Sequence, residues 1–191
     1  MAAKILAFAG SARTASYNKM LVKIAMKGAT AAGAEVAFVD LRDYPIPLYD
    51  EDMEKERGMP QPARDLKRIV QSCQGFLIAS PEYNGSFTPL MKNTLDWLTR
   101  KGGEGLDGNP FAGKFAGIMS ASPGALGGYR NLVVFRLLMG TLSMTTIPQQ
   151  ISISGAMNEF TPEGQLKDEK KQKSTENIGA ELAKLVLKVN G

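Results

Sequence analysis

The sequence predicts a doubly wound α/β domain whose central sheet has five parallel strands in the order 2-1-3-4-5. Short apolar runs alternate with longer segments whose apolar residues recur every three or four positions, which is the pattern of successive βαβ units. The first of these runs is almost continuously apolar, as strands covered on both faces are. Right-handed crossovers permit few strand orders, and 2-1-3-4-5 is common for this number of elements. The length of 191 residues predicts a single domain over residues 1–191.

The strands are assigned from apolar runs that end at turn-forming residues. The first run, KILAFA, is followed by Gly10, and the third, GFLIAS, by Pro81. A stretch with four prolines follows the second strand, and we expect it to be irregular. The predicted strands cover residues 4–9, 35–41, 75–80, 115–121 and 146–153.

Five helices are predicted from apolar residues spaced three and four apart. The first begins near Asn18, and Pro89 lies in the first turn of the third, where its missing N–H is tolerated. The expected buried faces are Leu21, Ile24, Ala25, Gly28 and Ala32 in the first helix, Leu66, Ile69, Val70 and Cys73 in the second, Met91, Leu95 and Leu98 in the third, and Ile178, Leu182, Leu185, Val186 and Val189 in the last.

The fourth helix, from about Tyr129 to Leu142, is apolar around nearly its whole circumference. A helix of this kind is buried on more than one side. We expect its second side to contact a neighbouring subunit; the alternative is a helix buried within its own domain. Its apolar residues are Leu132, Val133, Phe135, Leu137, Leu138, Met139 and Leu142.

Composition excludes several kinds of chemistry. The absence of histidine excludes Ser/His, Cys/His and His-ligated metal mechanisms, and a single cysteine excludes internal disulfides and fits a reducing compartment. The net charge of +4 gives little support for a nucleic-acid partner. The apolar run at residues 5–9 is too short for a signal peptide, and Arg136 interrupts the one at residues 132–139, so we expect a cytoplasmic protein without membrane association.

In an open α/β sheet of this order, ligands bind beyond the carboxyl ends of the strands, where the strand order reverses. The loop after the first strand carries hydroxyl and amide groups at Ser11, Thr14, Ser16 and Asn18, a guanidinium at Arg13, and then a helix start. Free N–H groups and the positive end of a helix dipole favour phosphate there. The alternative is that Ser16 only caps the helix and Arg13 is a solvated charge.

The loops after the third and fourth strands are also unusual. Residues 81–86, P-E-Y-N-G-S, form a turn that can present an aromatic surface and backbone donors to a flat heteroaromatic ring; the alternative is an ordinary Asn-Gly turn. Residues 122–128 contain three glycines, which let a backbone approach a ligand closely, or which form a flexible connection.

Together, G-S-x-R-x-x-S-x-N at residues 10–18 and P-E-Y-N-G-S at residues 81–86, followed by K-N-x-x-D-W-L at residues 92–98, resemble the NADPH-dependent FMN reductases. This flavodoxin-like family includes chromate, quinone and azo-dye reductases, and the resemblance extends along the whole chain, including residues 156–168. It implies a flavodoxin-like fold and an NAD(P)H oxidoreductase, with NADPH or NADH as cosubstrate. Hydride would pass through bound FMN to quinones, chromate, azo compounds or free flavin, with no metal and no side chain acting as acid or base.

The resemblance also implies roles for particular residues. The loop after the first strand would bind the FMN phosphate, the turn after the third would border the ring mainly through its backbone, and the fourth loop would close the pocket. Residues 92–98 would be structural, through Lys92, Asn93, Asp96 and Trp97, and the third and fourth helices would form a homodimer or homotetramer. The implied cofactor-binding residues are Ser11, Arg13, Ser16, Tyr17, Asn18, Pro81, Glu82, Tyr83, Asn84, Ser122 and Gly124.

Two other functions stay open from the sequence. One is a flavodoxin-type electron carrier without its own NAD(P)H turnover, although such carriers are strongly acidic and this chain is basic. The other is a non-redox regulator whose anion site binds a partner or metabolite. Flavin colour in the purified protein would exclude the non-redox regulator, because the enzyme and the electron carrier both bind flavin. Reduction of that flavin by NADPH would then distinguish the enzyme from the carrier.

Overall fold

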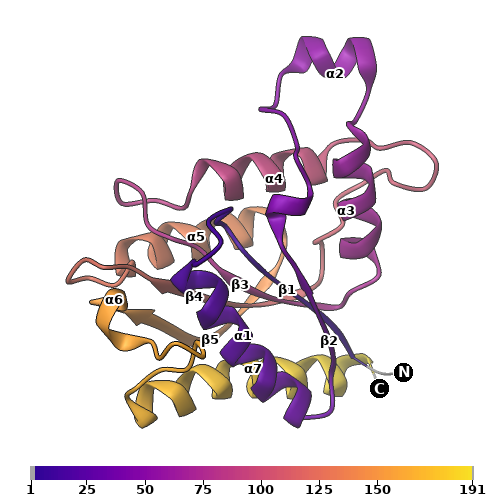
Figure 1. Ribbon diagram of the computed structural model, residues 1–191. Coiled ribbons are helices and arrows are strands. Elements are labelled where there is room, and N and C mark those ends of the chain that lie inside the picture. Colours follow the sequence, from indigo (N-terminus) through magenta and orange to yellow (C-terminus); the bar gives the residue numbers. More distant parts are fainter. Residues whose placement is uncertain (1–2, 191) are drawn as a thin grey trace.

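The computed structural model describes residues 3–190 (Figure 1). Its five strands form one parallel sheet in the order β2-β1-β3-β4-β5, which confirms the predicted topology. Met1, Ala2 and Gly191, which the predicted domain includes, lie outside the described residues. The strands are β1 (Lys4–Ala9), β2 (Glu35–Val39), β3 (Gly75–Ala79), β4 (Phe115–Ala121) and β5 (Thr145–Ile153).

Helices cover both faces of the sheet (Figure 1). One face packs against α1 (Tyr17–Ala31) and α7 (Glu169–Asn190). The other packs against α3 (Gln61–Gln71), α4 (Pro89–Thr99) and α5 (Tyr129–Thr141). The sheet is therefore the middle of three layers, which explains why its central strands are apolar on both sides.

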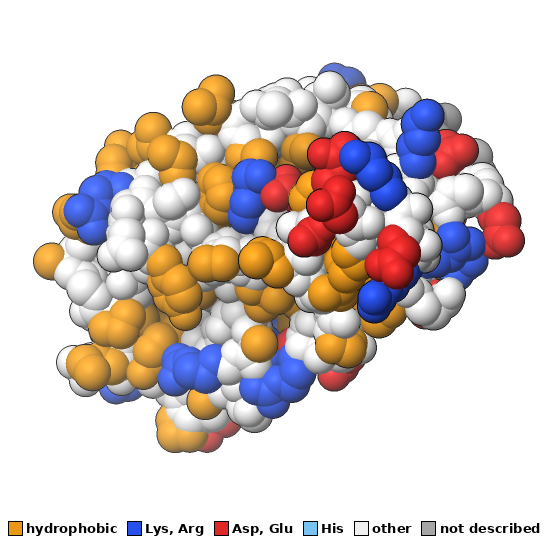
Figure 2. Space-filling view, turned by 90° about the horizontal axis from the view of Figure 1, so that it is seen from above, with side chains coloured by type: hydrophobic (Ala, Val, Ile, Leu, Met, Phe, Trp, Pro, Cys, Tyr) orange, Lys and Arg blue, Asp and Glu red, His pale blue; other side chains and the backbone are white. Residues whose placement is uncertain are grey.

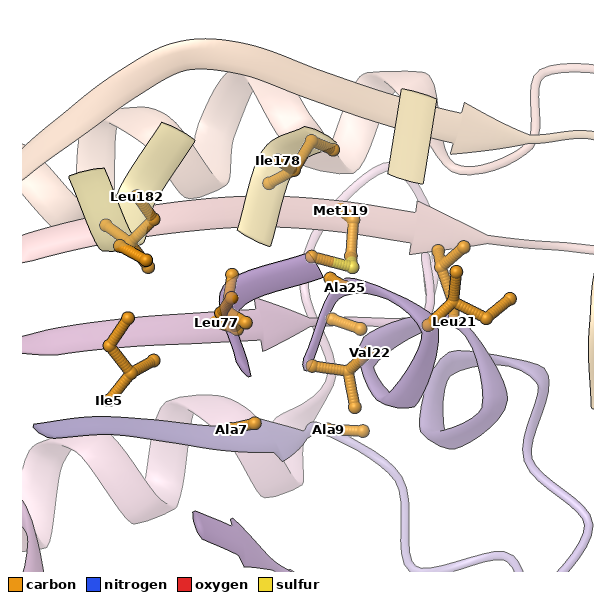
Figure 3. Packing of buried hydrophobic residues seen from close by; sticks show 14 of the residues in the cluster. Ile5, Ala7, Ala9, Leu21, Val22, Ala25, Leu77, Met119, Ile178 and Leu182 are labelled. Carbon is orange, nitrogen blue, oxygen red and sulfur yellow. The ribbon is translucent and has the colours of Figure 1, made fainter. Parts of the chain in front are cut away.

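The core under α1 and α7 is built from the side chains that the strand and helix periodicities predict. Figure 3 shows Ile5, Leu77 and Met119, from three neighbouring strands, facing Leu21 of α1 and Ile178 of α7. Each of these side chains is almost completely buried. Burying a large aliphatic side chain stabilises a fold by roughly 1.5–3 kcal/mol, so this layer is a main source of stability.

Two glycines let α1 and α7 cross at close range. A Cβ atom added at Gly28 would lie 1.8 Å from the Glu176 carbonyl oxygen, and one added at Gly179 would lie 1.8 Å from the Ala25 carbonyl oxygen. Any larger residue at either position would push the two helices apart. The requirement is steric, because both glycines are in ordinary helical conformation.

The second strand is shorter than predicted. It ends at Val39, and residues Leu41–Asp43 form a 3-10 turn, η1. Asp40 starts this turn, because its Oδ1 accepts a hydrogen bond of 3.0 Å from the N–H of Arg42. Leu41 is buried as expected, but its apolar character reflects packing of the turn on the core and does not mark a strand.

The expectation that the proline-containing stretch is irregular is wrong for α2 (Glu51–Arg57). Asp50 caps this helix by accepting from the N–H groups of Asp52 and Met53, and Gly58 ends it at φ 72°. Within the described chain none of the α2 residues is buried, so the helix has no apolar periodicity to detect. The helix could have been predicted from its charge pattern. It has acidic residues in its first turn and basic residues in its last turn, which is the arrangement that the helix dipole favours.

Helix α2 projects from the body of the molecule (Figure 1), and charged side chains gather over it in the view from above (Figure 2). A second helix that the sequence analysis did not predict is α6 (Ala156–Glu159), a single turn after β5. No helix within residues 3–190 is long and apolar enough to cross a membrane.

Helix α5 is buried on one side only. Leu132, Phe135 and Met139 lie in the core, whereas the side chains of Val133 and Leu137 are 58% and 73% exposed. The alternative that this helix is buried within its own domain is therefore wrong. Val133 and Leu137 are exposed apolar side chains without cover within residues 3–190, and Arg130 and Thr141 are exposed on the same helix.

Three expected helix-face residues, Cys73, Val189 and Ala32, do not lie on a buried helix face; Ala32 follows the end of α1 at Ala31 and is half-buried. Cys73 is buried, but it follows the end of α3 at Gln71 and donates to the Ile69 carbonyl oxygen at 3.3 Å. Burial raises the pKa of this thiol, so it is protonated at neutral pH. Val189, in the last turn of α7, is 60% exposed because α7 extends past the edge of the core.

Candidate functional site

A cleft of about 300 Å³ lies where the carboxyl ends of β1, β3 and β4 meet. The sheet reverses its strand order between β1 and β3, and this is the place where open α/β sheets bind ligands. Three larger hollows within residues 3–190, beside α5, between α1 and β2 and between α1 and α7, lie away from these strand ends. The cleft is lined by Ser11, Arg13, Ser16, Tyr17, Asn18, Pro81, Tyr83, Ala121 and Pro123.

Gly10 lets the first loop leave the sheet beside α4. Its N–H donates to the Ala79 carbonyl oxygen at 2.9 Å, and its own carbonyl oxygen accepts from Thr88 Oγ1 at 2.7 Å. A Cβ atom at Gly10 would lie 2.9 Å from Thr88 Oγ1 and 3.0 Å from Met91 Cβ. The glycine is therefore required by close packing, and Thr88, which also caps α4, joins the loop to that helix.

The amino end of α1 opens into the cleft without a side-chain cap. Ser16 occupies the cap position, but its hydroxyl makes no capping hydrogen bond, although the residue is 2% exposed. The alternative that Ser16 merely caps the helix is therefore wrong. The first backbone hydrogen bond of the helix runs from the N–H of Met20 to the Ser16 carbonyl oxygen, which leaves the N–H groups of the first turn for a ligand.

Arg13 extends along the same wall. Its guanidinium carbon lies 4.9 Å from the centre of the Tyr17 ring, and Tyr17 stacks on Phe160 at 5.7 Å between ring centres. This stack fixes the cation beside the helix end while its hydrogen-bonding groups stay exposed. A guanidinium, a free hydroxyl at Ser16 and the end of a helix dipole form a suitable site for a phosphate group.

Asn18 lines the cleft with its carboxamide engaged elsewhere. Its Nδ2 donates to the Ala121 carbonyl oxygen, and its Oδ1 accepts from the Ala121 N–H. The side chain thus joins α1 to the end of β4. The implied direct contact between Asn18 and a phosphate stays a prediction, because one amide hydrogen is left for it.

The turn after β3 is a tight hairpin. Tyr83 and Ser86 exchange backbone hydrogen bonds of 2.9 and 3.1 Å, and Asn84 and Gly85 between them have φ values of 52° and 84°. Two positive φ values define a type I′ turn, for which Asn-Gly is the favoured pair. The turn holds the Tyr83 ring, 58% exposed, at the mouth of the cleft.

Glu82 faces away from the cleft. Its carboxylate forms an ion pair with Arg130 and accepts from the N–H of Asn131 at 3.3 Å, at the amino end of α5. Glu82 and Asn84 therefore do not belong to the cleft lining through their side chains, which agrees with the expectation that this turn acts mainly through its backbone.

Beneath this turn lies a buried polar group made of Ser80, Ser120 and Asn131. The Ser80 carbonyl oxygen accepts from Ser120 Oγ at 2.7 Å and from Asn131 Nδ2 at 2.9 Å. Gly128, at φ 89°, packs over Ser120, and a Cβ atom there would lie 1.9 Å from Ser120 Oγ. Asn131 Oδ1 is buried without a hydrogen-bond partner within residues 3–190. These contacts fix the ends of β3 and β4 below the cleft.

The fourth loop contributes different residues from those the resemblance implies. Ala121 and Pro123 line the cleft, whereas Ser122 and Gly124 lie outside its lining, with Ser122 Oγ accepting from the Gly124 N–H at 3.2 Å. Alternation along an extended segment explains the offset, because neighbouring residues point to opposite sides. The end of β4 and the loop after it thus reach the cleft through Ala121 and Pro123, and the implied contacts of Ser122 and Gly124 with the cofactor stay predictions.

Three residues that no sequence pattern indicated, Lys19, Asp40 and Arg42, form a cluster in contact with the first loop and α1. Arg42 Nη1 donates to Thr14 Oγ1 at 2.8 Å, and its Nη2 donates to the Ala12 carbonyl oxygen. Asp40 Oδ2 pairs with Lys19 Nζ at 2.6 Å. Burial would raise the pKa of Asp40, but the hydrogen bonds and charges of Lys19 and Arg42 outweigh it and hold that pKa below its usual value. No local motif marks these residues, because their contacts join the segment after β2 to the first loop and to α1, which are distant in the sequence.

The K-N-x-x-D-W-L motif has a structural role, as the resemblance implies. Asn93 Nδ2 and Trp97 Nε1 both donate to the Pro47 carbonyl oxygen, at 2.9 and 2.8 Å. They hold the segment after β2 against α4, while Lys92 and Asp96 form an ion pair of 2.7 Å along the helix surface.

A doubly wound parallel sheet of this order, with a polar cleft at the β1/β3 switch point, defines the flavodoxin-like class of α/β proteins. The family model for NADPH-dependent FMN reductases matches residues 3–158. The chain belongs to the NADPH-dependent FMN reductase family.

Individual relatives agree with this assignment. The chain is 32% identical over 168 residues to an NAD(P)H-dependent FMN reductase of Pseudomonas aeruginosa, an alignment that covers 87% of this chain and 86% of the relative. It is 30% identical to an NAD(P)H:quinone oxidoreductase of Solanum tuberosum, with 98% and 95% covered. The solved structure of FerB, a flavoenzyme NAD(P)H:(acceptor) oxidoreductase from Paracoccus denitrificans, has the same fold, with a TM-score of 0.81, 24% identity and 97% and 98% covered.

Proposed function

We propose that this protein is an FMN-dependent NAD(P)H oxidoreductase that reduces quinone-type small molecules. The observation that carries the proposal is the uncapped amino end of α1, which shares one cleft with the Arg13 guanidinium and the exposed Tyr83 ring. Relatives named as FMN reductase and as quinone oxidoreductase, each aligned over most of this chain, support the activity.

The residues present fit a flavin mononucleotide. A phosphate group needs donors and positive charge, which the first turn of α1, Ser16 and Arg13 supply. A planar ring needs a flat border, which the Tyr83 turn and Pro123 supply. The cleft contains no acidic side chain among its lining residues, so nothing there repels a phosphate.

Bound in this cleft, FMN would supply the redox chemistry by accepting hydride from NADPH or NADH and reducing the acceptor. The chain's own residues hold and orient the cofactor: Arg13 and Ser16 bind the anionic end, and the rigid Tyr83 hairpin fixes the border of the ring. The open cleft mouth leaves room for a second substrate beside Tyr83. No lining side chain is suited to act as a general base at neutral pH, in agreement with chemistry that depends on the cofactor.

The test is reconstitution followed by reduction. Purified protein that is incubated with FMN and then desalted should retain flavin absorbance at about 450 nm. Anaerobic mixing with NADPH or NADH should bleach that absorbance, and a quinone should restore it over many turnovers. A flavin that stays oxidised would indicate an electron carrier, and protein that retains no flavin would indicate a non-redox anion-binding protein; either result overturns the proposal.

We propose in addition that the protein is a homodimer or homotetramer that uses the exposed side of α5. Tyr129, Val133 and Leu137 are spaced four residues apart, so they form one apolar stripe, and their exposures are 54%, 58% and 73%. The stripe begins where the fourth loop leaves the cleft, and a neighbouring subunit would cover it. An uncovered stripe of this kind on a surface helix is typical of an interaction site.

A further inference from the structure

Arg42 contacts the predicted phosphate-binding loop without lining the cleft. Its guanidinium donates to the Ala12 carbonyl oxygen and, at 2.8 Å, to Thr14 Oγ1, and Arg42 is not part of the cleft lining. It therefore bridges two residues that flank Arg13. Two donors of one rigid planar group fix both the position and the orientation of this loop segment.

The backbone of Arg42 is itself fixed. Its N–H donates to Asp40 Oδ1 at 3.0 Å, within the 3-10 turn that Asp40 starts. The other carboxylate oxygen of Asp40 binds Lys19 Nζ at 2.6 Å, and the Lys19 side chain, on the first turn of α1, is only 7% exposed. Arg42 thus joins the loop to the same helix turn whose N–H groups face the cleft.

Resting on the proposed function, we infer that Arg42 is a positioning residue for the FMN phosphate site. By binding the Ala12 carbonyl oxygen, the guanidinium keeps that partial negative charge away from the cleft, where it would oppose an anion. By binding Thr14 as well, it holds the residues on both sides of Arg13, so that the Arg13 guanidinium stays over Tyr17 at the cleft wall. The contribution of Arg42 to FMN binding depends on the forked geometry of its guanidinium group as well as on its charge.

The Arg42→Lys variant distinguishes the effect of the guanidinium geometry from the effect of the positive charge. An ammonium group keeps the positive charge, but it is a point donor on a flexible chain and does not reproduce the planar fork. The matched control for loss of one surface charge is Arg57→Ala, because Arg57 is exposed on α2 and, within residues 3–190, forms an ion pair only with the neighbouring Glu56 at 3.2 Å.

The experiment titrates FMN and riboflavin, which lacks the phosphate, against flavin-free wild type and the Arg42→Ala, Arg42→Lys and Arg57→Ala variants, with flavin fluorescence as readout. We expect Arg42→Ala to raise the Kd for FMN by about 10- to 100-fold, because FMN must then order a loop segment that has lost charged hydrogen bonds of this strength. The Kd of this variant for riboflavin should stay within about twofold of the wild-type value, because riboflavin has no phosphate group for the loop to bind. Arg42→Lys should restore only part of the FMN affinity, and Arg57→Ala should bind as wild type does.

Three results would overturn the inference while leaving the proposed function intact: an unchanged FMN Kd in Arg42→Ala, an equal loss for riboflavin, or full restoration by lysine, which would make the effect one of charge alone. Wild-type protein that binds neither flavin would overturn the proposed function itself. The thermal midpoint of each flavin-free variant reports separately whether the fold is retained.

Discussion

The side chain of Asn18 and the backbone of Ala121 form a closed pair of hydrogen bonds, with Nδ2 donating to the carbonyl oxygen at 2.8 Å and Oδ1 accepting from the N–H at 2.9 Å. Both residues are buried. The pair fixes the first turn of α1, which the proposed phosphate site uses, to the end of β4, which forms the opposite wall. We therefore expect Asn18 to set the width of the cleft and to affect a phosphate indirectly.

Replacing Asn18 by alanine should lower the free energy of unfolding by about 2–4 kcal/mol, because two buried backbone groups of Ala121 lose their partner. Urea denaturation of the flavin-free protein measures this loss. Asn177→Ala is the control, since Asn177 is exposed on α7 and its substitution should leave stability nearly unchanged. A loss below about 1 kcal/mol in Asn18→Ala would show that water replaces the side chain.

Arg13→Ala should weaken FMN binding by about 1.5–3 kcal/mol, the scale of one hydrogen bond to a charged group. The reason is that Arg13 is the cation of the cleft lining, held over Tyr17 beside the amino end of α1. Titration of the flavin-free protein with FMN gives the difference in affinity. Arg68→Ala, which removes an exposed arginine from α3, should bind FMN as tightly as wild type; if Arg13→Ala does the same, the phosphate binds elsewhere.

The Glu54–Arg100 pair should make stability depend on pH. Arg100 donates to the Glu54 carboxylate at 2.7–2.9 Å, and this contact holds the pKa of Glu54 below its usual value. Because the folded state favours the charged form, the stabilisation is present above the usual pKa of 4.5 and is lost as the pH falls through the lower folded value. Glu54→Gln should therefore cost about 1 kcal/mol at neutral pH.

The cost should shrink toward zero as the pH falls through the lowered pKa of Glu54 in the folded wild type, because its carboxyl group then becomes neutral as well. Urea midpoints of both proteins across this range measure it. Glu56→Gln is the matched control, because the Glu56 side chain is 69% exposed and, among the described residues, forms an ion pair only with its neighbour Arg57. A cost that stays constant with pH would assign the effect to packing.

Leu137→Arg should reduce the oligomer to a monomer, because it places a charge at the most exposed residue of the apolar stripe on α5. Light scattering coupled to gel filtration measures the mass directly. Leu48→Arg is the control, since Leu48 is 78% exposed but lies in the segment after β2, away from α5. Wild-type protein that elutes as a monomer would contradict the proposed assembly.

Much of the architecture follows from local patterns. The continuous apolar run of residues 4–9 and the three- and four-residue spacing in residues 178–186 report burial, which is a property that each segment carries in its own sequence. Helix α2 escaped detection for the same reason, since it buries nothing and only its capping and charge pattern mark it.

Part of the candidate site could likewise be predicted from the sequence, and part could not. Ser11, Arg13, Ser16 and Tyr17 were placed from one contiguous loop, and the structure brings them to the cleft. Ala121 and Pro123 line the cleft, whereas the resemblance implied Ser122 and Gly124. Which of these neighbouring residues face the cleft depends on the path of the chain after β4, and the order of residues in the sequence does not define that path.

By itself, the sequence determined the strand order, the loops at the switch point and the family. The tertiary structure alone decided that Asn18 binds Ala121, that Arg42 holds the first loop from behind, and that one side of α5 stays uncovered. The physical reason is that periodicity and turn chemistry act between residues close in the chain. The direction of a polar side chain is instead set by partners that only the assembled sheet brings within hydrogen-bonding distance.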